Sequence, residues 1–146
     1  MKFVLAPLLI ILSSMSYAGD TYLGFQWGLL SRGGLIWGVH LDDKNSVELH
    51  LTGLSHYASY GVSLKHQYDD HNYLIAGYTG VSWFNLIEES NLLFHGLNLG
   101  IGHNYGSKES GEWSYPLEIG GGAGYERNKD QWAPMMFFGY GLIYNY

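Results

Sequence analysis

Five ionisable residues spread along the chain carry the groups that could do chemistry. They are two imidazoles, two carboxylates and one ammonium group: His40, Glu48, His50, Lys65 and Glu118. An imidazole beside a carboxylate can serve as a general base, but a buried charge must in any case be paired. Because buried charge pairs are more often structural than catalytic, we expect an internal salt-bridge network. Lys65 would pair with Glu48 or Glu118, and the other polar groups would be satisfied by His40, His50, Gln26, Gln67 and Asn98.

Hairpin geometry gives this network an expected arrangement. If residues 43–45 form a turn, His40 faces Glu48 across two paired strands. If residues 55–59 form the next turn, His50 lies beside Lys65. His40, Glu48 and His50 could in principle supply three metal ligands. A neighbouring ammonium group opposes cation binding, so we expect neither a metal nor a cofactor.

The elements that must position these residues are strands. Eight segments alternate between apolar and polar residues with a period of two, which is typical of strands. Residues rich in turn formers separate them, for example Asp42–Asn45 and Asp69–Asn72. The expected strands are Tyr22–Leu30, Leu35–Asp42, Ser46–Leu54, Ser59–Tyr68, Tyr73–Phe84, Leu92–Asn104, Ser114–Glu126 and Pro134–Tyr146.

The N-terminal residues are typical of a secretory signal peptide. Lys2 is followed by an apolar run, residues 3–12, and then by small residues at positions 16 and 18. The apolar run is shorter than the roughly 20 residues that a membrane-spanning helix needs. We therefore expect residues 1–18 to be removed after Ala18, leaving a single domain, residues 19–146.

Composition indicates which face of the strands points outward. Only 14% of the residues are charged, against about 25% in ordinary soluble domains. The polar faces carry Gly, Asn, Gln and Ser rather than Lys and Glu, as suits the narrow interior of a small barrel. The apolar faces carry aromatic residues, among which we place Tyr73, and favour contact with lipid. A secreted soluble β-domain would alternate in the same way and remains the alternative.

The end of the chain carries a more specific pattern. Aromatic and aliphatic residues alternate up to the last position: Phe138, Tyr140, Leu142, Tyr144 and Tyr146. This pattern, with Gly139, resembles the C-terminal assembly signature of bacterial outer-membrane β-barrels. The whole mature chain is similar to the small eight-stranded members of that class. The resemblance implies an all-β, eight-stranded antiparallel up-and-down transmembrane β-barrel in the outer membrane of a Gram-negative bacterium.

The same resemblance implies partners. They would be outer-membrane lipids and lipopolysaccharide, and the barrel assembly machinery acting through the C-terminal strand. Seven Lys and Arg residues against 13 Asp and Glu disfavour a nucleic-acid partner. We expect a monomer with a plugged interior and a structural or surface-interaction role.

The alternative is a lipid-modifying enzyme of the outer leaflet, which hydrolyses or transfers acyl groups of lipid A or phospholipids. Its weak candidates are His56 and Ser59, because a hydroxyl near an imidazole can act as a nucleophile. The segment resembles in part the His-x-Ser-Asn motif of the outer-membrane lipid A deacylases. Its spacing is one residue too long, the Asn is missing, and it lies too early in the chain, so we interpret the match as a coincidence.

Overall fold

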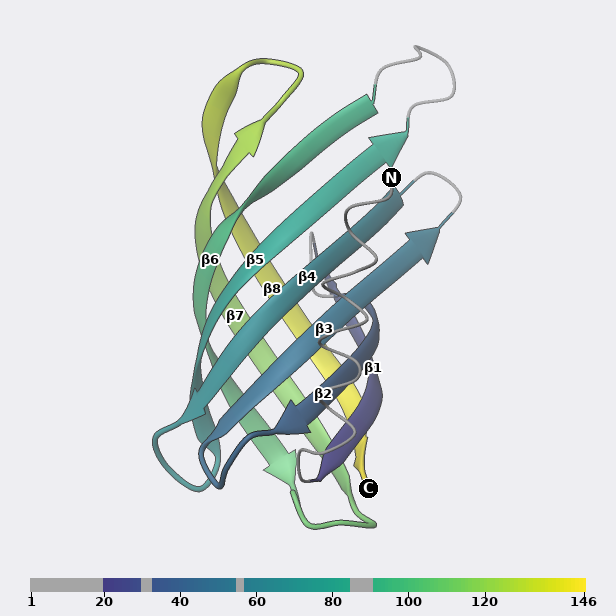
Figure 1. Cartoon of the computed structure of the whole chain (residues 1–146), viewed down its shortest axis with the longest axis vertical. Coiled ribbons are helices and arrows are strands. Elements are labelled where there is room, and N and C mark those ends of the chain that lie inside the picture. The colour runs from purple at the N-terminus through teal and green to yellow at the C-terminus, as the bar shows by residue number, and fades with distance from the viewer. Residues whose placement is uncertain (1–19, 30–32, 55–56, 85–90) are drawn as a thin grey trace.

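The computed structural model describes residues 20–29, 33–54, 57–84 and 91–146. These residues form a closed barrel of eight strands in which each strand pairs with its neighbours in sequence (Figure 1). The described residues contain no helix long and apolar enough to cross a membrane. The strands are β1 (Thr21–Leu29), β2 (Gly34–His40), β3 (Asn45–Leu54), β4 (Tyr57–Gln67), β5 (Asn72–Phe84), β6 (Asn91–Gly106), β7 (Trp113–Glu126) and β8 (Gln131–Asn145).

All eight strand pairs are antiparallel, and β1 closes the barrel by pairing with β8. Tyr22 lies opposite Asn145 at this seam, and the amide of Tyr146 donates to the carbonyl of Thr21. The predicted eight-stranded antiparallel up-and-down barrel is therefore confirmed. The start of β1, the C-terminus and the β2–β3, β4–β5 and β6–β7 turns all lie at one end, which we call the terminal end (Figure 1).

Alternation along the strands separates an inner from an outer face. The inner face carries polar side chains together with glycines, which leave room for large neighbours. Tyr22 lies opposite Gly38, and Tyr73 lies opposite Gly102. A Cβ atom at either glycine would overlap the ring of its tyrosine partner. Small and large residues thus alternate around the wall, and together they fill a narrow barrel.

One prediction about the faces is wrong. The sequence segment 73–84 has apolar residues on both faces, and we expected Tyr73 to point outward. Instead, Tyr73 is buried inside the barrel, in a cluster with Ile75 and Phe137. The reason is the space above Gly102, which accepts the tyrosine ring on the inner face.

The outer face of the described strands is apolar. Every Asp, Glu, Lys and Arg within them faces inward and is buried: Glu48, Lys65, Glu118 and Glu126. The large exposed side chains include Leu51, Leu64, Leu74, Leu97, Leu99, Ile101, Ile119 and Met136. Some exposed aromatic residues lie towards the strand ends, such as Tyr105, Trp113 and Tyr115 at the terminal end and Trp132 at the other, whereas Phe25, Tyr78, Phe138 and Tyr140 lie in mid-strand.

Candidate functional site

A buried ion-pair network fills the middle of the barrel. Lys65 Nζ lies 2.6 Å from Glu48 Oε2 and 2.6 Å from Glu118 Oε1. The three residues come from β4, β3 and β7, so the network crosses the interior rather than following one wall. Both carboxylates are fully buried. Such charges are tolerated in an interior only when they are paired and hydrogen-bonded.

Side chains from β1, β3 and β5 complete the hydrogen bonding of the two carboxylates. Tyr73 donates to Glu118 Oε1 at 2.8 Å, and Gln26 Nε2 donates to Glu118 Oε2 at 3.1 Å. The hydroxyl of Tyr22 donates to Glu48 Oε2 at 3.2 Å. His50 Nε2 lies 2.6 Å from Glu48 Oε1. Five strands (β1, β3, β4, β5 and β7) are thereby joined through two acidic groups, which rigidifies the barrel interior.

The structure brings Glu48, His50, Lys65 and Glu118 together, but the expected registers are wrong. Glu48 lies opposite Gly38 rather than His40, and His50 lies opposite Gly61 rather than beside Lys65. The β2–β3 turn comprises residues 41–44, and β4 begins two residues earlier than expected. Lys65 still contacts Glu48 despite the different register, because it lies diagonal to Glu48 across the β3–β4 pair and its side chain is long enough to reach the carboxylate. His50 reaches Glu48 because residues two apart share a face.

His40 forms no hydrogen bond or ion pair with Glu48, Lys65 or Glu118 among the described residues. Its imidazole lies against the ring of Tyr22, with 5.0 Å between ring centroids, at the terminal end of the interior. The three residues considered as metal ligands therefore do not converge. The described part of the chain holds no group of three His, Asp or Glu residues placed to bind a metal ion.

The interior beyond the network is also occupied. Asn98 Nδ2 donates to the hydroxyl of Thr79 at 2.9 Å. Ile75 and Phe137 are buried, and the Phe137 ring fills the space left by Gly100 and Gly120. Side chains therefore fill the barrel interior along much of its length, as expected for eight strands.

Ser59 lies on the inner face of β4, opposite Thr52 and Val81, and its side chain is buried. Its hydroxyl therefore points into the barrel interior, away from the outer face. His56, its suggested partner, lies outside the described residues.

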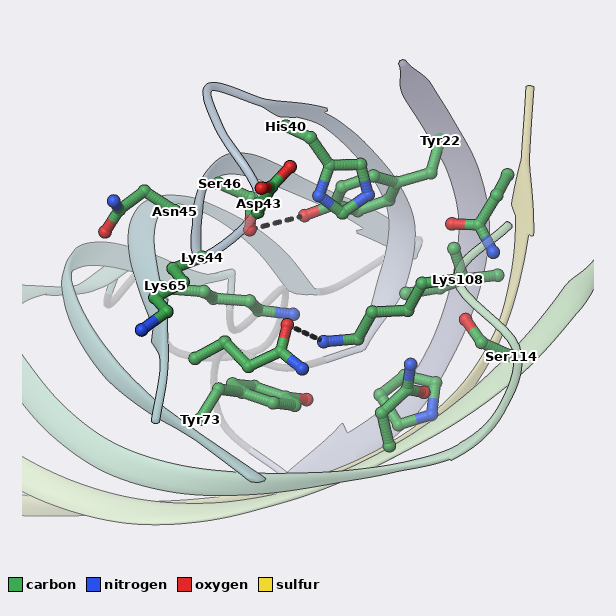
Figure 2. Close-up of a pocket in the computed structure, with 15 residues that line it drawn as sticks. Tyr22, His40, Asp43, Lys44, Asn45, Ser46, Lys65, Tyr73, Lys108 and Ser114 are labelled. Carbon is green, nitrogen blue, oxygen red and sulfur yellow. Dashed lines mark hydrogen bonds between the residues drawn. The ribbon is translucent and has the colours of Figure 1, made fainter. Parts of the chain in front are cut away.

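A pocket opens at the terminal end, between the network and solvent (Figure 2). It contains a residue that the sequence pattern does not single out: Lys108, in the β6–β7 connection. Lys108 Nζ donates to Gln67 Oε1 at 2.5 Å and lies 5.8 Å from the centre of the Tyr73 ring. Partial burial, followed by the nearby Lys65 ammonium, lowers the pKa of Lys108 to about 8, and Asp69 opposes this shift only in part. Strand alternation could not reveal this residue, because it lies in a turn.

Two matching turns shape the rim of this pocket. In the first, Asp42 Oδ1 accepts from the amides of Lys44 and Asn45 at 2.8 and 2.7 Å. In the second, Asp69 Oδ1 accepts from the amides of His71 and Asn72 at 2.9 and 2.7 Å. Side-chain bonds from Asn45 and Asn72, followed by these amide bonds, lower the pKa values of the two aspartates. Such turns use Asp and Asn to satisfy backbone donors locally.

Each turn is also tied to the next strand by an imidazole. His66 Nδ1 lies 2.9 Å from Asn45 Oδ1, and His103 Nδ1 lies 2.8 Å from Asn72 Oδ1. The longer β6–β7 connection is fastened through Asn145, whose Nδ2 donates to the carbonyls of Ser107 and Glu112 at 3.2 Å. These bonds hold Lys108 over the pocket.

Comparison with known proteins adds no assignment for this site. No protein-family model, no curated protein and no solved structure matches the chain. The geometry of the interior and the character of the outer face are therefore the observations from which function has to be inferred.

Proposed function

We propose that the chain is an integral outer-membrane β-barrel protein with a plugged polar interior and a structural or surface-interaction role. The observation that carries the proposal is the outer face of the described strands, which has no Asp, Glu, Lys or Arg. Large apolar side chains on it are open to the surroundings, with Leu97, Leu99 and Met136 about 70% exposed. Such a contiguous apolar surface is rare on soluble monomers and typical of proteins that face lipid.

Strand length supports the same proposal. A tilted strand needs about 9–11 residues to cross a bilayer. The strands β3 to β8 contain 10 to 16 residues, β1 contains nine, and β2 is the exception with seven. Closure of the barrel through β1 and β8 pairs the backbone groups along the seam, which a lipid environment requires.

The filled interior supports a role other than that of a pore. Lys65, Glu48 and Glu118 join opposite walls, and Tyr22 and Tyr73 occupy the remaining space around them. The interior of an eight-stranded barrel is just wide enough for side chains to fill it. We expect no ohmic conductance steps when the purified protein is inserted into planar lipid bilayers. Regular, reproducible steps would contradict a plugged interior.

The proposed partners follow from the location. Outer-membrane lipids and lipopolysaccharide would surround the apolar outer face. The barrel assembly machinery would bind the C-terminal strand, whose alternate side chains Phe138, Tyr140 and Tyr146 are exposed. The protein would act as a monomer, because a closed barrel has no free edge along its seam.

Fractionation of bacterial cells that express the full chain tests this proposal. We expect the protein in the outer-membrane fraction, resistant to extraction with alkaline carbonate. In gels run without boiling it should migrate differently from the boiled sample, because a folded barrel resists detergent. Recovery in the soluble periplasmic fraction would contradict the proposal.

A further inference from the structure

We propose that the pocket at the terminal end binds hydrogen phosphate, either as the free ion or as the singly protonated terminal group of a phosphate monoester. The pocket is lined by residues of all eight strands and of the β2–β3 and β6–β7 connections, and Lys65 of the ion-pair network is one of them (Figure 2). It is separate from the apolar outer face, so phosphate binding does not require that the barrel lies in a membrane.

Charge is the first reason. Lys65 and Lys108 reach into the pocket from opposite sides (Figure 2). Lys65 has two carboxylates at 2.6 Å. Lys108 forms no ion pair within 4 Å in the described part of the chain, and its ammonium group donates a hydrogen bond to the neutral amide of Gln67. A half-buried ammonium group without a carboxylate favours an anion beside it.

Buried polar atoms are the second reason. Asn104 lines the pocket, is 6% exposed, and its Oδ1 has no hydrogen-bond partner among the described residues. Nε2 of His40, in the same pocket, is also buried without such a partner. Buried polar atoms in proteins normally form a hydrogen bond, so each of these atoms is expected to have a partner that a ligand could supply. Asn104 Oδ1 accepts only, so a bound anion has to donate a hydrogen bond to it.

Hydrogen phosphate meets both demands, because it carries negative oxygens and one P–OH group. Sulfate and carboxylates carry the charge but lack the donor. The pocket volume is about 50 Å³. At roughly 10–15 Å³ for each water-sized group, it holds about four such groups, which matches the four oxygens of phosphate. Asp43 and Lys44 stand at the exposed rim with opposite charges, so the entrance is close to neutral.

Calorimetric titration of the folded full-length mature chain in zwitterionic detergent tests the proposal. With sodium phosphate at pH 7.5 we expect saturable binding to one site. Sodium sulfate at equal ionic strength should bind at least tenfold more weakly. No saturable phosphate binding, or equal binding of the two anions, would overturn the proposal.

Three variants assign the site. Lys108→Met should weaken phosphate binding at least tenfold, and Lys108→Gln serves the same purpose if the first variant does not fold. Asn104→Leu should abolish the preference for phosphate over sulfate. Lys129→Met, at the opposite end of the barrel, is the matched control and should bind as the parent does. Unchanged binding in both Lys108 variants would refute the assignment.

The pH dependence gives a separate readout. Because the pKa of Lys108 is about 8, about a tenth of its amines are charged at pH 9, and affinity, expressed per hydrogen phosphate dianion, should fall roughly tenfold from pH 7. Other titratable groups line the pocket, namely Lys65, His40, Tyr22, Tyr73, Asp43 and Lys44, and the Asp69 carboxylate acts on Lys108 from the β4–β5 turn. The comparison with Lys108→Gln isolates the contribution of Lys108, because the phosphate affinity of this variant should not fall between pH 7 and pH 9. A fall of equal size in Lys108→Gln would contradict the assignment.

Two further titrants identify the source of the phosphate. At pH 6, where a substantial part of a phosphate monoester still carries a P–OH group, glycerol 1-phosphate binding as tightly as the free ion would assign the pocket to the end of a soluble monoester. Micelles that contain phosphatidate would bind the parent and not Lys108→Met if a lipid headgroup is the ligand. Binding of inorganic phosphate alone would restrict the pocket to the free ion.

Discussion

Lys65 and Glu118 form an ion pair of 2.6 Å across the interior of the barrel, although β5 and β6 separate their strands along the wall. The same ammonium group lies 2.6 Å from Glu48. A single cation therefore holds two buried carboxylates, and its loss would leave both without their shared partner. The network is a structural element on which the closed interior depends.

Replacing Lys65 by methionine tests this dependence. Removal of one partner from a buried pair typically costs about 3–5 kcal/mol, so the free energy of unfolding should fall by about that amount. Denaturant unfolding of the barrel in lipid vesicles measures it. Lys44→Met, at an exposed position of the β2–β3 turn, is the control and should change stability by less than about 0.5 kcal/mol.

Neutralising the carboxylates together with the lysine should recover most of this loss. In the triple variant Lys65→Met, Glu48→Gln and Glu118→Gln, no buried charge is left unpaired. A triple variant as unstable as Lys65→Met would show that the charges are not the cause.

The packing of tyrosines over glycines predicts a second effect. Gly102→Ala places a Cβ atom against the ring of Tyr73, which would displace the donor of the 2.8 Å bond to Glu118. Overpacking of this kind costs about 1–3 kcal/mol. Gly53→Ala is the matched control, since a Cβ atom there meets nothing within 4 Å, and it should leave the unfolding midpoint unchanged or raise it slightly. Equal effects at the two glycines would contradict the packing explanation.

Acid should remove the stabilisation supplied by Asp69. Its folded-state pKa is lowered from 3.8 by bonds from Asn72 and His71. A depressed carboxyl pKa contributes stability above the unfolded value, and that stability is lost as pH falls through the lower folded value. Asp69→Ala should therefore lower the unfolding midpoint at pH 6, and the difference from the parent should shrink below about pH 4.

The neighbouring Asp70→Ala is the control for this measurement. The Asp70 carboxylate makes none of the turn bonds, and only its backbone carbonyl accepts from Gln67, at 2.9 Å. The variant should be as stable as the parent at both pH values. A difference between Asp69→Ala and the parent that grows on acidification would contradict a stabilising role for the ionised Asp69 carboxylate.

The sequence predicted the faces of the strands better than their registers. Period-two alternation shows which side Glu48, Lys65 and Glu118 occupy, because side chains two residues apart share a face. Register depends on turn length. Because the β2–β3 turn comprises residues 41–44, His40 pairs with Ser46 rather than Glu48.

Two residues show why the remaining features were not predictable. Tyr73 lies in a segment with apolar residues on both faces, so only the space over Gly102, on a different strand, decides where it points. Lys108 lies in a turn, where no periodicity applies, and its position over the pocket depends on bonds between Asn145 and the connection. Both depend on contacts between residues far apart in the chain.

The central claim is that the outer face of the barrel contacts lipid, and a pair of arginine substitutions on β6 tests it most directly. Leu99 is 68% exposed in the middle of the apolar band, and Tyr105 is 55% exposed on the same face near the terminal end. Arginine at the bilayer midplane costs about 2–4 kcal/mol, and about 0–1 near the interface. The free energy of unfolding in lipid vesicles should therefore fall by about 2–4 kcal/mol in Leu99→Arg and by at most about 1 kcal/mol in Tyr105→Arg. Equal, near-zero effects at the two positions would contradict a membrane-spanning barrel.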